Sequence, residues 1–350
     1  MFSISVCMIV KNEECVLQRI LECVKLFADE IIIVDTGSTD NTIKIAKQFT
    51  DNIYHFKWIN DFASARNFSF SYATKDYIMW LDADDYITEE NIIKIINLKK
   101  NSDNSIDVYM LKYIMGFEND YHTFEFYRER ILKNNGEFKW EGFVHEVITP
   151  KGNIKYVDIE IEHRKEKHSN PKRNLNLYNK ALKLGKIFTP REQYYYAREL
   201  YYNNYLNKCE KELKKYLKMN DKYTPNILGA YEILSNIYLI TNSTIKGKNI
   251  LFKCFEYITP NSQLLINLAK FFEMENNIES AIFYYHAAII SPRTQNGFVS
   301  PDTHEFIPYL ELCRLYYSKG LINTAKTYHN LAKKIHPKHP SIIYNEKFFK

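Results

Sequence analysis

The chain has 350 residues, of which 45% are hydrophobic and 25% charged, and its formal net charge is +5. This length favours two domains, and the composition is that of a globular protein. The mild charge is spread along the chain and does not indicate nucleic-acid binding, and no apolar run approaches the roughly 18 residues of a membrane span.

The N-terminal residues are apolar but lack a basic start, so they predict a first strand and not a signal peptide. The six cysteines show no CxxC spacing and are expected to be reduced core residues. Both features are typical of a cytoplasmic protein.

Strands and helices are expected to alternate over the N-terminal part of the chain. The expected strands are Ser3–Val10, Glu30–Val34, Ile53–Phe56 and Tyr77–Leu81, and the expected helices are Glu13–Phe27, Asn41–Phe49 and Ala63–Tyr72. The run Glu30–Val34 is continuously apolar, as in a strand buried on both faces of a parallel sheet. This alternation predicts an α/β domain that binds ligands beyond the carboxyl ends of its strands.

Three aspartates, Asp82, Asp84 and Asp85, follow the expected strand Tyr77–Leu81 directly. In an extended backbone Asp82 and Asp84 point to the same face, where their charges repel unless a cation lies between them. Oxygen ligands suit Mg²⁺ or Mn²⁺, and such a pair commonly binds a nucleotide-linked substrate. The alternative is a solvated acidic turn that caps the next helix.

The segment Asp35-Thr36-Gly37-Ser38 follows the second expected strand. The same four residues mark aspartic proteases, but those enzymes need two copies in an all-β surround, and this single copy opens a helix. A carboxylate here can instead bind a base or ribose, or the segment can be a plain turn. Because Asp35 and Asp82 both lie at strand ends, a shared ligand site is favoured.

Arg66 lies on an expected helix whose other face is apolar. A guanidinium at this position suits a diphosphate or a carboxylate such as Asp82. The alternative is an ordinary surface arginine.

From Asp107 to His163 the pattern changes to strand-like segments between polar loops. The expected strands are Val108–Ile114, Thr123–Tyr127, Arg130–Lys133 and Lys155–Glu162. Between them, an aromatic loop leads to His145 and Glu146, which could supply a general base, help to hold a metal, or be surface residues. His163 could be a further ligand or a structural histidine. The charged stretch Arg164–Lys172 is the expected domain boundary.

Beyond this boundary the chain is expected to be helical and repetitive. Asn249–Pro260, Ala281–Pro292 and Ala325–Pro337 carry small or aromatic residues at helical spacing and end in a proline. A partner helix is expected at Gln263–Met274 and a degenerate fourth pair at Tyr194–Met219. Such units resemble tetratricopeptide hairpins of about 34 residues, and the alternative is a non-repetitive bundle.

Six motifs occur in order along the first half of the chain. They are Ile9-Val10-Lys11-Asn12-Glu13, Val34-Asp35-Thr36-Gly37-Ser38-Thr39-Asp40, Asp61-Phe62-Ala63-Ser64-Ala65-Arg66-Asn67, Leu81-Asp82-Ala83-Asp84, Trp140-Glu141-Gly142-Phe143-Val144-His145-Glu146 and Arg173-Asn174-Leu175. Together they resemble the GT-A glycosyltransferases of family 2. The most similar subgroup carries a tetratricopeptide tail and includes the peptide S-glycosyltransferases of glycocin biosynthesis. The N-terminal half alone also resembles lipopolysaccharide-core β-glucosyltransferases.

This resemblance implies an α/β GT-A domain, Rossmann-like with a mixed sheet, over residues 1–170. An all-α tetratricopeptide-like domain would follow over residues 171–350. The resemblance covers the first half motif by motif and the tail by architecture only.

The resemblance also implies the roles of individual residues. Asp84, with Asp82 and His163, would bind Mn²⁺ or Mg²⁺, and Glu146 or His145 would be the base of an inverting enzyme. The residues implied to bind the nucleotide-sugar are Val10, Asn12, Glu13, Asp35, Ser38, Arg66, Asp82 and Ala83. The chain departs from the family pattern in having His-Glu where Glu-Asp is usual. It also has Arg164-Lys165 after His163, where Gly-Tyr is often found.

The expected donor is a UDP-sugar carrying a hexose. Because tetratricopeptide grooves hold peptides, the expected acceptor is a Cys thiol or a Ser/Thr hydroxyl of a peptide or protein. The alternative acceptor is a saccharide or lipid-linked molecule of cell-surface polysaccharide synthesis, with the tail serving assembly such as homodimerisation. A third hypothesis is a non-catalytic scaffold, against which the intact carboxylate pair and His163 argue.

Overall fold

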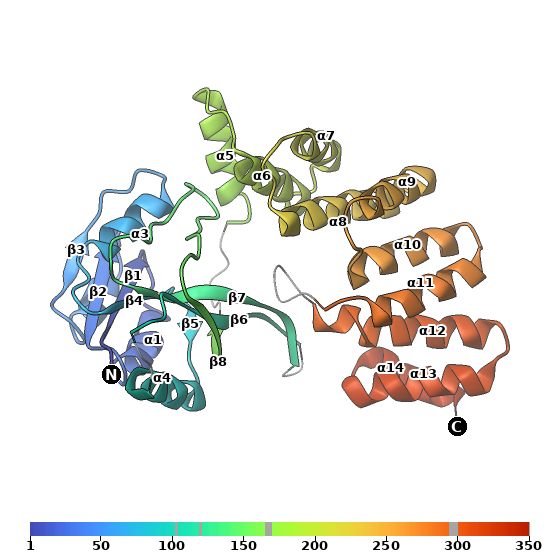
Figure 1. The fold of residues 1–350 in the computed structure, drawn as a ribbon, viewed down its shortest axis with the longest axis horizontal. Helices are drawn as coiled ribbons and strands as arrows, with labels where there is room; N and C mark the ends of the chain where they lie inside the picture. The colour runs from blue at the N-terminus through green and yellow to red at the C-terminus, as the bar shows by residue number, and fades with distance from the viewer. Residues whose placement is uncertain (102–103, 119–120, 165–169, 294–299, 350) are drawn as a thin grey trace. The chain divides into compact units, whose positions relative to one another are not determined.

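The structure is a computed structural model that describes residues 1–101, 104–118, 121–164, 170–293 and 300–349. The chain divides into two compact units, Met1–Ile187 and Phe188–Lys350 (Figure 1). The boundary expected in Arg164–Lys172 falls on a stretch that includes residues 165–169, which lie outside the described part.

The N-terminal unit is built on one eight-stranded sheet with the order β3-β2-β1-β4-β7-β6-β8-β5. Its parallel side consists of β1 (Ile4–Val10), β2 (Glu30–Asp35), β3 (Ile53–His55) and β4 (Tyr77–Trp80). Its other side consists of β5 (Asp85–Tyr86), β6 (Val108–Glu118), β7 (Tyr121–Lys133) and β8 (Ile154–His163). Strand β7 is antiparallel to both β4 and β6, so the sheet is mixed, as predicted.

Successive residues of the central strands pack on opposite faces of the sheet, because side chains alternate along a strand. Val6 and Met8 of β1 join a core with α1 (Leu17–Val24) and α4 (Glu89–Asn101), whereas Cys7 joins a second core with α3 (Phe62–Phe70). Two further helices of this unit are α2 (Thr42–Ala46) and α5 (Arg173–Lys183). Ile20 and Val24 of α1 and the adjacent Val16 and Phe27 are all buried.

Two features of the sheet differ from the prediction. Strand β7 is continuous where two short strands were expected, because its charged residues are paired: Arg128 with Glu129, and Arg130 with Asp85. For the aspartates after β4 an extended segment and an acidic turn were both open; the chain turns there, with the amide of Asp85 donating to the carbonyl of Asp82 at 3.1 Å. This turn leads into β5, which was not predicted.

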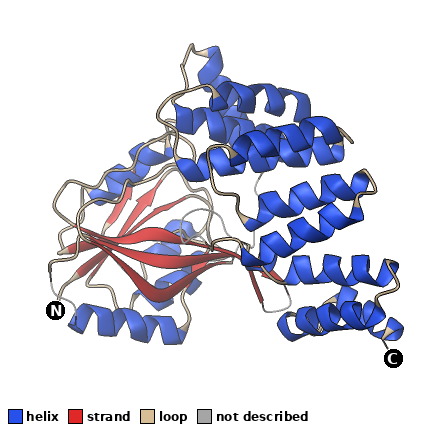
Figure 2. Cartoon of the chain, turned by 45° about the vertical axis from the view of Figure 1, so that its right-hand side comes forward, coloured by secondary structure: helices blue, strands red, loops and turns tan. Residues whose placement is uncertain are grey.

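The C-terminal unit contains only helices among its described residues, whereas all described strands belong to the N-terminal unit (Figure 2). Four helical hairpins follow one another. They are α6 (Pro190–Tyr202) with α7 (Leu206–Leu217), α8 (Thr224–Ile240) with α9 (Thr244–Phe255), α10 (Ser262–Met274) with α11 (Ile278–Ile290), and α12 (Phe306–Ser318) with α13 (Ile322–Ile335). A short helix α14 (Pro340–Asn345) follows them.

Small residues allow these helices to pack closely. Ala281 and Ala288 are fully buried together with Tyr285, as the sequence pattern predicts. A side chain at Gly247 of α9 would overlap the ring of Phe271 of α10, so this contact requires glycine. The sequence did not identify α8 and α12 individually, but the repeated hairpin architecture is confirmed. Among the described helices, none is long and apolar enough to cross a membrane.

Candidate active site

A cavity of about 650 Å³ lies at the carboxyl ends of the parallel strands of the N-terminal unit. Its lining comes from the ends of β1 and β8, the segments that follow β1 and β2, the loop before α3 and α3 itself, the turn after β4, the loop before Val147, and the first turn of α5. The lining residues are Ile9, Val10, Lys11, Asn12, Glu13, Val16, Thr36, Trp58, Phe62, Arg66, Asp82, Ala83, Asp84, Val144, His145, Glu146, His163, Arg173 and Asn174. This is the place in an open α/β sheet where ligands bind.

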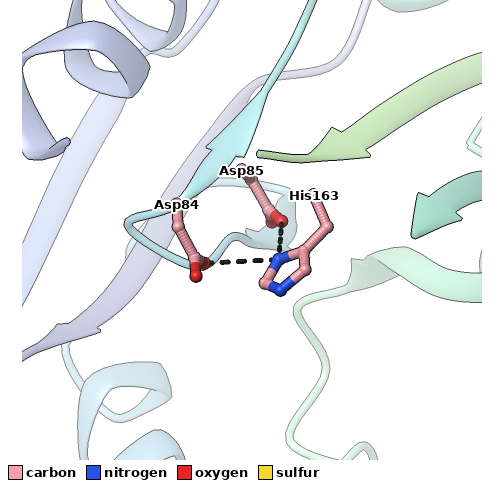
Figure 3. A group of neighbouring side chains, drawn as sticks. All are labelled: Asp84, Asp85 and His163. Carbon is pink, nitrogen blue, oxygen red and sulfur yellow. Dashed lines mark ion pairs between the residues drawn. The ribbon is translucent and has the colours of Figure 1, made fainter. Parts of the chain in front are cut away.

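Asp84, Asp85 and His163 form a group of potential metal ligands whose atoms lie within 4.8 Å of one another (Figure 3). His163 Nδ1 is 3.4 Å from Asp84 Oδ1 and 3.9 Å from Asp85 Oδ1. The pairing of β5 with β8 places Asp85 opposite His163 and thereby brings this histidine to the aspartate turn. Asp82 is not part of this group, because its carboxylate faces Arg66.

The charges around Asp84 favour a cation. Burial raises the pKa of Asp84, and the carboxylates of Asp82 and Asp85 raise it further, against the opposing effect of His163. For His163 itself, burial lowers the pKa, but Asp85 and Asp84 outweigh this effect and the net shift is upward. Carboxylate and imidazole ligands together suit Mn²⁺, and a divalent ion would relieve this repulsion.

Arg66 connects two carboxylates across the cavity. Its Nη2 donates to Asp82 Oδ1 at 2.6 Å and its Nε donates to Glu146 Oε1 at 2.8 Å. The guanidinium is buried and lies 5.2 Å from the centroid of the Trp80 ring and 4.8 Å from that of Trp140. The predicted contact with Asp82 is therefore present, and Arg66 is not a surface arginine.

This contact changes the acidity of Asp82. Burial alone would raise the pKa of its carboxyl group, but the charge of Arg66 dominates the other contributions and lowers the pKa to about 2. Asp82 is consequently a permanent anion at neutral pH.

The loop that carries His145 and Glu146 is fixed by Asn67 of α3. The Asn67 amide donates to the Trp140 carbonyl at 2.9 Å, and its Oδ1 accepts from the Trp140 amide at 2.8 Å. His145 has a left-handed backbone with φ of 53°. Both His145 and Glu146 line the cavity, so the structure brings the two predicted base candidates to the aspartate turn. Asn67 belongs to one of the six motifs, but its hydrogen bonds to the backbone of Trp140 were not predicted.

The segments after β1 and β2 are joined by hydrogen bonds. The amide of Asn12 donates to Ser38 Oγ at 3.0 Å, and Asn12 Oδ1 accepts from the amide of Thr39 at 2.7 Å. Asp35 is buried and its carboxylate accepts from the amides of Gly37 and Ser38. Val10, Asn12 and Glu13 line the cavity, whereas Asp35 and Ser38 are not among its described lining residues.

Residues 5–153 match the family model described as Glycosyl transferase family 2. This span includes the ends of β1 and β2, the aspartate turn, Arg66 and Glu146. The chain contains a glycosyltransferase family 2 domain. The match confirms the predicted family resemblance of the N-terminal part, and the mixed sheet followed by helical hairpins confirms the predicted fold class.

Relatives of this chain include the SPbeta prophage-derived glycosyltransferase SunS of Bacillus subtilis. The two are 30% identical over 254 residues, which cover 68% of this chain and 59% of SunS. A TPR repeat-containing protein of Synechococcus elongatus is 43% identical over 90 residues, covering 26% of this chain and 22% of the relative. The chain thus spans less than two thirds of the length of these relatives.

Among solved structures, glucosyl-3-phosphoglycerate synthase from Mycobacterium tuberculosis, in complex with Mg²⁺ and uridine-diphosphate, is similar over 32% of this chain and 44% of that chain. The sequence identity is 18% and the TM-score is 0.28.

Proposed function

We propose that the chain is an inverting, metal-dependent glycosyltransferase that moves a hexose from a UDP-sugar to a thiol or hydroxyl of a peptide or protein. The observation that carries this proposal is that Asp84 and His163, which suit a divalent cation, share one cavity with Glu146, a candidate base. A donor phosphate group and an acceptor nucleophile would therefore meet in the same space.

Asp84 and His163 would hold Mn²⁺ or Mg²⁺ together with the donor diphosphate. When bound, the cation would neutralise charge on the diphosphate and make UDP a better leaving group. Lys11 and Arg173 also line the cavity and add positive charge toward the donor. Arg66 is engaged by Asp82 and Glu146, so its part is to orient these two carboxylates.

Glu146 is the proposed base because Arg66 fixes its Oε1 and a carboxylate offers a second oxygen to an acceptor. Glu146 takes the proton of the thiol or hydroxyl, and the sulfur or oxygen forms a bond to the anomeric carbon. The bond between that carbon and the diphosphate oxygen breaks, and its electron pair leaves with UDP. His145, at the same rim of the cavity, is the alternative base.

The four helical hairpins support a peptide or protein acceptor, because tetratricopeptide-like arrays present extended surfaces for peptides. The similarity to SunS, whose name states that it is a glycosyltransferase, supports the transfer reaction. A saccharide acceptor and a non-catalytic scaffold remain distinguishable outcomes of the experiment below. Assembly as a homodimer through the helices stays a prediction.

Asp84→Asn tests the proposal at the metal ligand. We expect wild-type protein to hydrolyse a UDP-hexose slowly with Mn²⁺ and without acceptor, and we expect the variant to lose this activity at an unchanged melting temperature. EDTA should abolish the wild-type activity. Mass spectrometry of Cys- and Ser-containing peptides after incubation should show a mass increase of one hexose. Hydrolysis with transfer only to saccharides would favour the alternative acceptor, and no hydrolysis would favour the scaffold.

A further inference from the structure

A buried network of side chains lies directly behind His163. The Tyr113 hydroxyl of β6 is 2.9 Å from Asp85 Oδ1 and 3.0 Å from His163 Nδ1. The other oxygen of Asp85, Oδ2, accepts from Arg130 Nη1 at 3.0 Å and from the amide of Asp82 at 2.9 Å. Asp85 and Arg130 are both fully buried.

Both oxygens of Asp85 are thus engaged by protein donors. A carboxylate in this position cannot also turn toward an ion in the cavity without depriving the buried charge of Arg130 of its carboxylate partner, which is strongly unfavourable. Asp85 therefore acts as a support for neighbouring groups, although it lies close to Asp84 and His163 (Figure 3).

Arg130 makes this support rigid. Its guanidinium lies between two aromatic rings, 3.7 Å from the centroid of Trp80 and 4.2 Å from that of Tyr113. The ring of Tyr113 is consequently held on one side by Arg130, and its hydroxyl is held by Asp85. A hydroxyl fixed in this way forms a hydrogen bond of defined geometry with His163.

The available protons determine which group donates in the hydrogen bond between Tyr113 and His163. An ionised carboxylate only accepts hydrogen bonds, so the single proton of the Tyr113 hydroxyl is donated to Asp85. The hydroxyl oxygen can then accept from His163, whose Nδ1 must carry a proton. The other neighbours of Nδ1, Asp84 Oδ1 at 3.4 Å and Asp85 Oδ1 at 3.9 Å, are also acceptors. In a neutral imidazole this leaves Nε2 unprotonated, with a lone pair that can bind a metal ion.

We propose that Tyr113, held by Asp85 and Arg130, is a positioning residue that fixes the proton of His163 on Nδ1 and presents Nε2 to the divalent cation. This inference rests on the metal site of the proposed function. It assigns Asp84 Oδ2 and His163 Nε2 as the protein atoms available to the ion. Partners of this kind behind a ligating histidine typically change metal affinity by about 10- to 100-fold.

Tyr113→Phe removes only the hydroxyl and keeps the ring that packs on Arg130. The matched control is Tyr77→Phe, because Tyr77 is also a buried tyrosine of this sheet, and its hydroxyl donates to the carbonyl of Ile106 at 2.6 Å, outside the network. Mn²⁺ binding is measured by electron paramagnetic resonance titration of each full-length protein. We expect about 10- to 100-fold weaker binding for Tyr113→Phe and unchanged binding for Tyr77→Phe, with equal losses of melting temperature.

Two spectroscopic readouts separate positioning from a general structural effect. Electron spin echo measurements on the Mn²⁺-loaded protein should show coupling to an imidazole nitrogen in the wild type, with reduced amplitude in Tyr113→Phe. In metal-free wild-type protein with ¹⁵N-labelled histidine, measured at alkaline pH where the imidazole is neutral, the His163 signals should be those of a protonated Nδ1 and an unprotonated Nε2. Their assignment comes from their loss in His163→Asn, so this measurement does not depend on the folding of Tyr113→Phe.

The outcomes distinguish this inference from the proposed function. If the wild type binds no Mn²⁺, the metal site itself is wrong and the positioning role falls with it. If the wild type binds Mn²⁺ but Tyr113→Phe binds equally well with the same nitrogen coupling, only the positioning role is overturned. A neutral His163 imidazole with its single proton on Nε2 in the metal-free wild type would overturn it as well.

Discussion

Arg66 joins the two sides of the cavity, because its guanidinium bonds Asp82 on the donor side and Glu146 on the proposed acceptor side. Because the guanidinium lies close to the rings of both Trp80 and Trp140, it has little freedom to move with either carboxylate. The pKa of the Arg66 guanidinium is raised: burial opposes this shift, but Asp82 and Glu146 outweigh burial. The three residues therefore behave as one charged unit.

Replacing Arg66 by methionine keeps most of the volume and removes the charge. Asp82 and Glu146 would then face each other without compensation, and we expect the free energy of unfolding to fall by about 3 kcal/mol. We also expect kcat/KM for sugar transfer to fall by at least about 100-fold, because Glu146 loses the group that orients it. Urea unfolding and steady-state kinetics measure the two effects.

Arg314 of α12 provides a matched control. It also pairs with two carboxylates, Glu273 and Glu311, but its side chain is 54% exposed. Arg314→Met should therefore cost less than about 1 kcal/mol and leave transfer unchanged. Equal costs for the two substitutions would show that burial of the Arg66 unit does not matter.

Asp82 gives this unit a pH dependence. Its folded-state pKa of about 2 lies below the ordinary value near 3.9, so it contributes stability above about pH 4 that is lost as the pH falls toward 2. Urea unfolding between pH 6 and pH 2 should show this loss, of about 2 kcal/mol, in the wild type and not in Asp82→Asn. Parallel pH curves for the two proteins would contradict the assignment.

At the scale of helices and strands, some elements are determined by the local sequence and others by pairing with distant residues. The strands β1 and β2 and the helix α3 follow from runs of apolar residues and from helical periodicity, so the sequence predicts them. Strand β5 consists of only Asp85 and Tyr86, and it exists because Asp85 pairs with His163 in β8. The continuity of β7 likewise depends on Arg130 finding Asp85 in the core. Neither partner is visible in the local sequence, where buried charges look like loop residues.

The same distinction applies to the site. Motif order indicated that Asp84, Glu146 and His163 meet, and they do line one cavity. Tyr113 lies in the middle of an otherwise ordinary strand, and no residue near it in the sequence signals a role. Its function emerges only when the sheet places it between Asp85 and His163. Residues that contact a ligating side chain, as Tyr113 contacts His163, are brought there by tertiary packing. Their role therefore cannot be predicted from the sequence.

Helix α8 carries a carboxylate that should destabilise the C-terminal unit at neutral pH. Burial raises the pKa of Glu232 to about 7, above its ordinary value near 4.3. Between these two pH values the unfolded chain releases its proton first, so stability falls as the pH rises and the loss is complete above pH 7. Glu232→Gln should therefore match the wild type near pH 4.5 and exceed it by about 1–2 kcal/mol at pH 8 in urea unfolding.

Glu210 of the neighbouring helix α7 is the control with the opposite sign. Burial would raise its pKa, but hydrogen bonds from Lys214 and Tyr238 lower it overall. Glu210→Gln should consequently reduce stability slightly at pH 8. A stabilising effect of both substitutions would point to net charge and not to the burial of Glu232.

At the scale of the whole molecule, the candidate active site belongs to one unit. Every described residue that lines the cavity lies between Ile9 and Asn174, within Met1–Ile187. This range includes the first turn of α5, which lies beyond the boundary that the sequence suggested after residue 170. The helical hairpins of Phe188–Lys350 supply none of the described lining residues.

Two fragments test where the catalytic unit ends. Fragment 1–187 keeps α5, in which Leu175 and Tyr178 are buried and the Tyr178 hydroxyl lies 3.5 Å from the Val144 carbonyl. We expect this fragment to fold and to retain Mn²⁺-dependent hydrolysis of the UDP-sugar at a rate near that of the full chain. Transfer to a peptide should fall with the loss of the hairpins.

Fragment 1–170 lacks α5 and should lose about 3–6 kcal/mol of stability, because burying two side chains of this size contributes about 1.5–3 kcal/mol each. It should also hydrolyse the donor poorly, since Arg173 and Asn174 leave the cavity and the support of the His145 loop is lost. Circular dichroism melts and hydrolysis assays on both fragments measure these effects. Equal stability and hydrolysis in the two fragments would place the boundary at residue 170 and remove α5 from the catalytic unit.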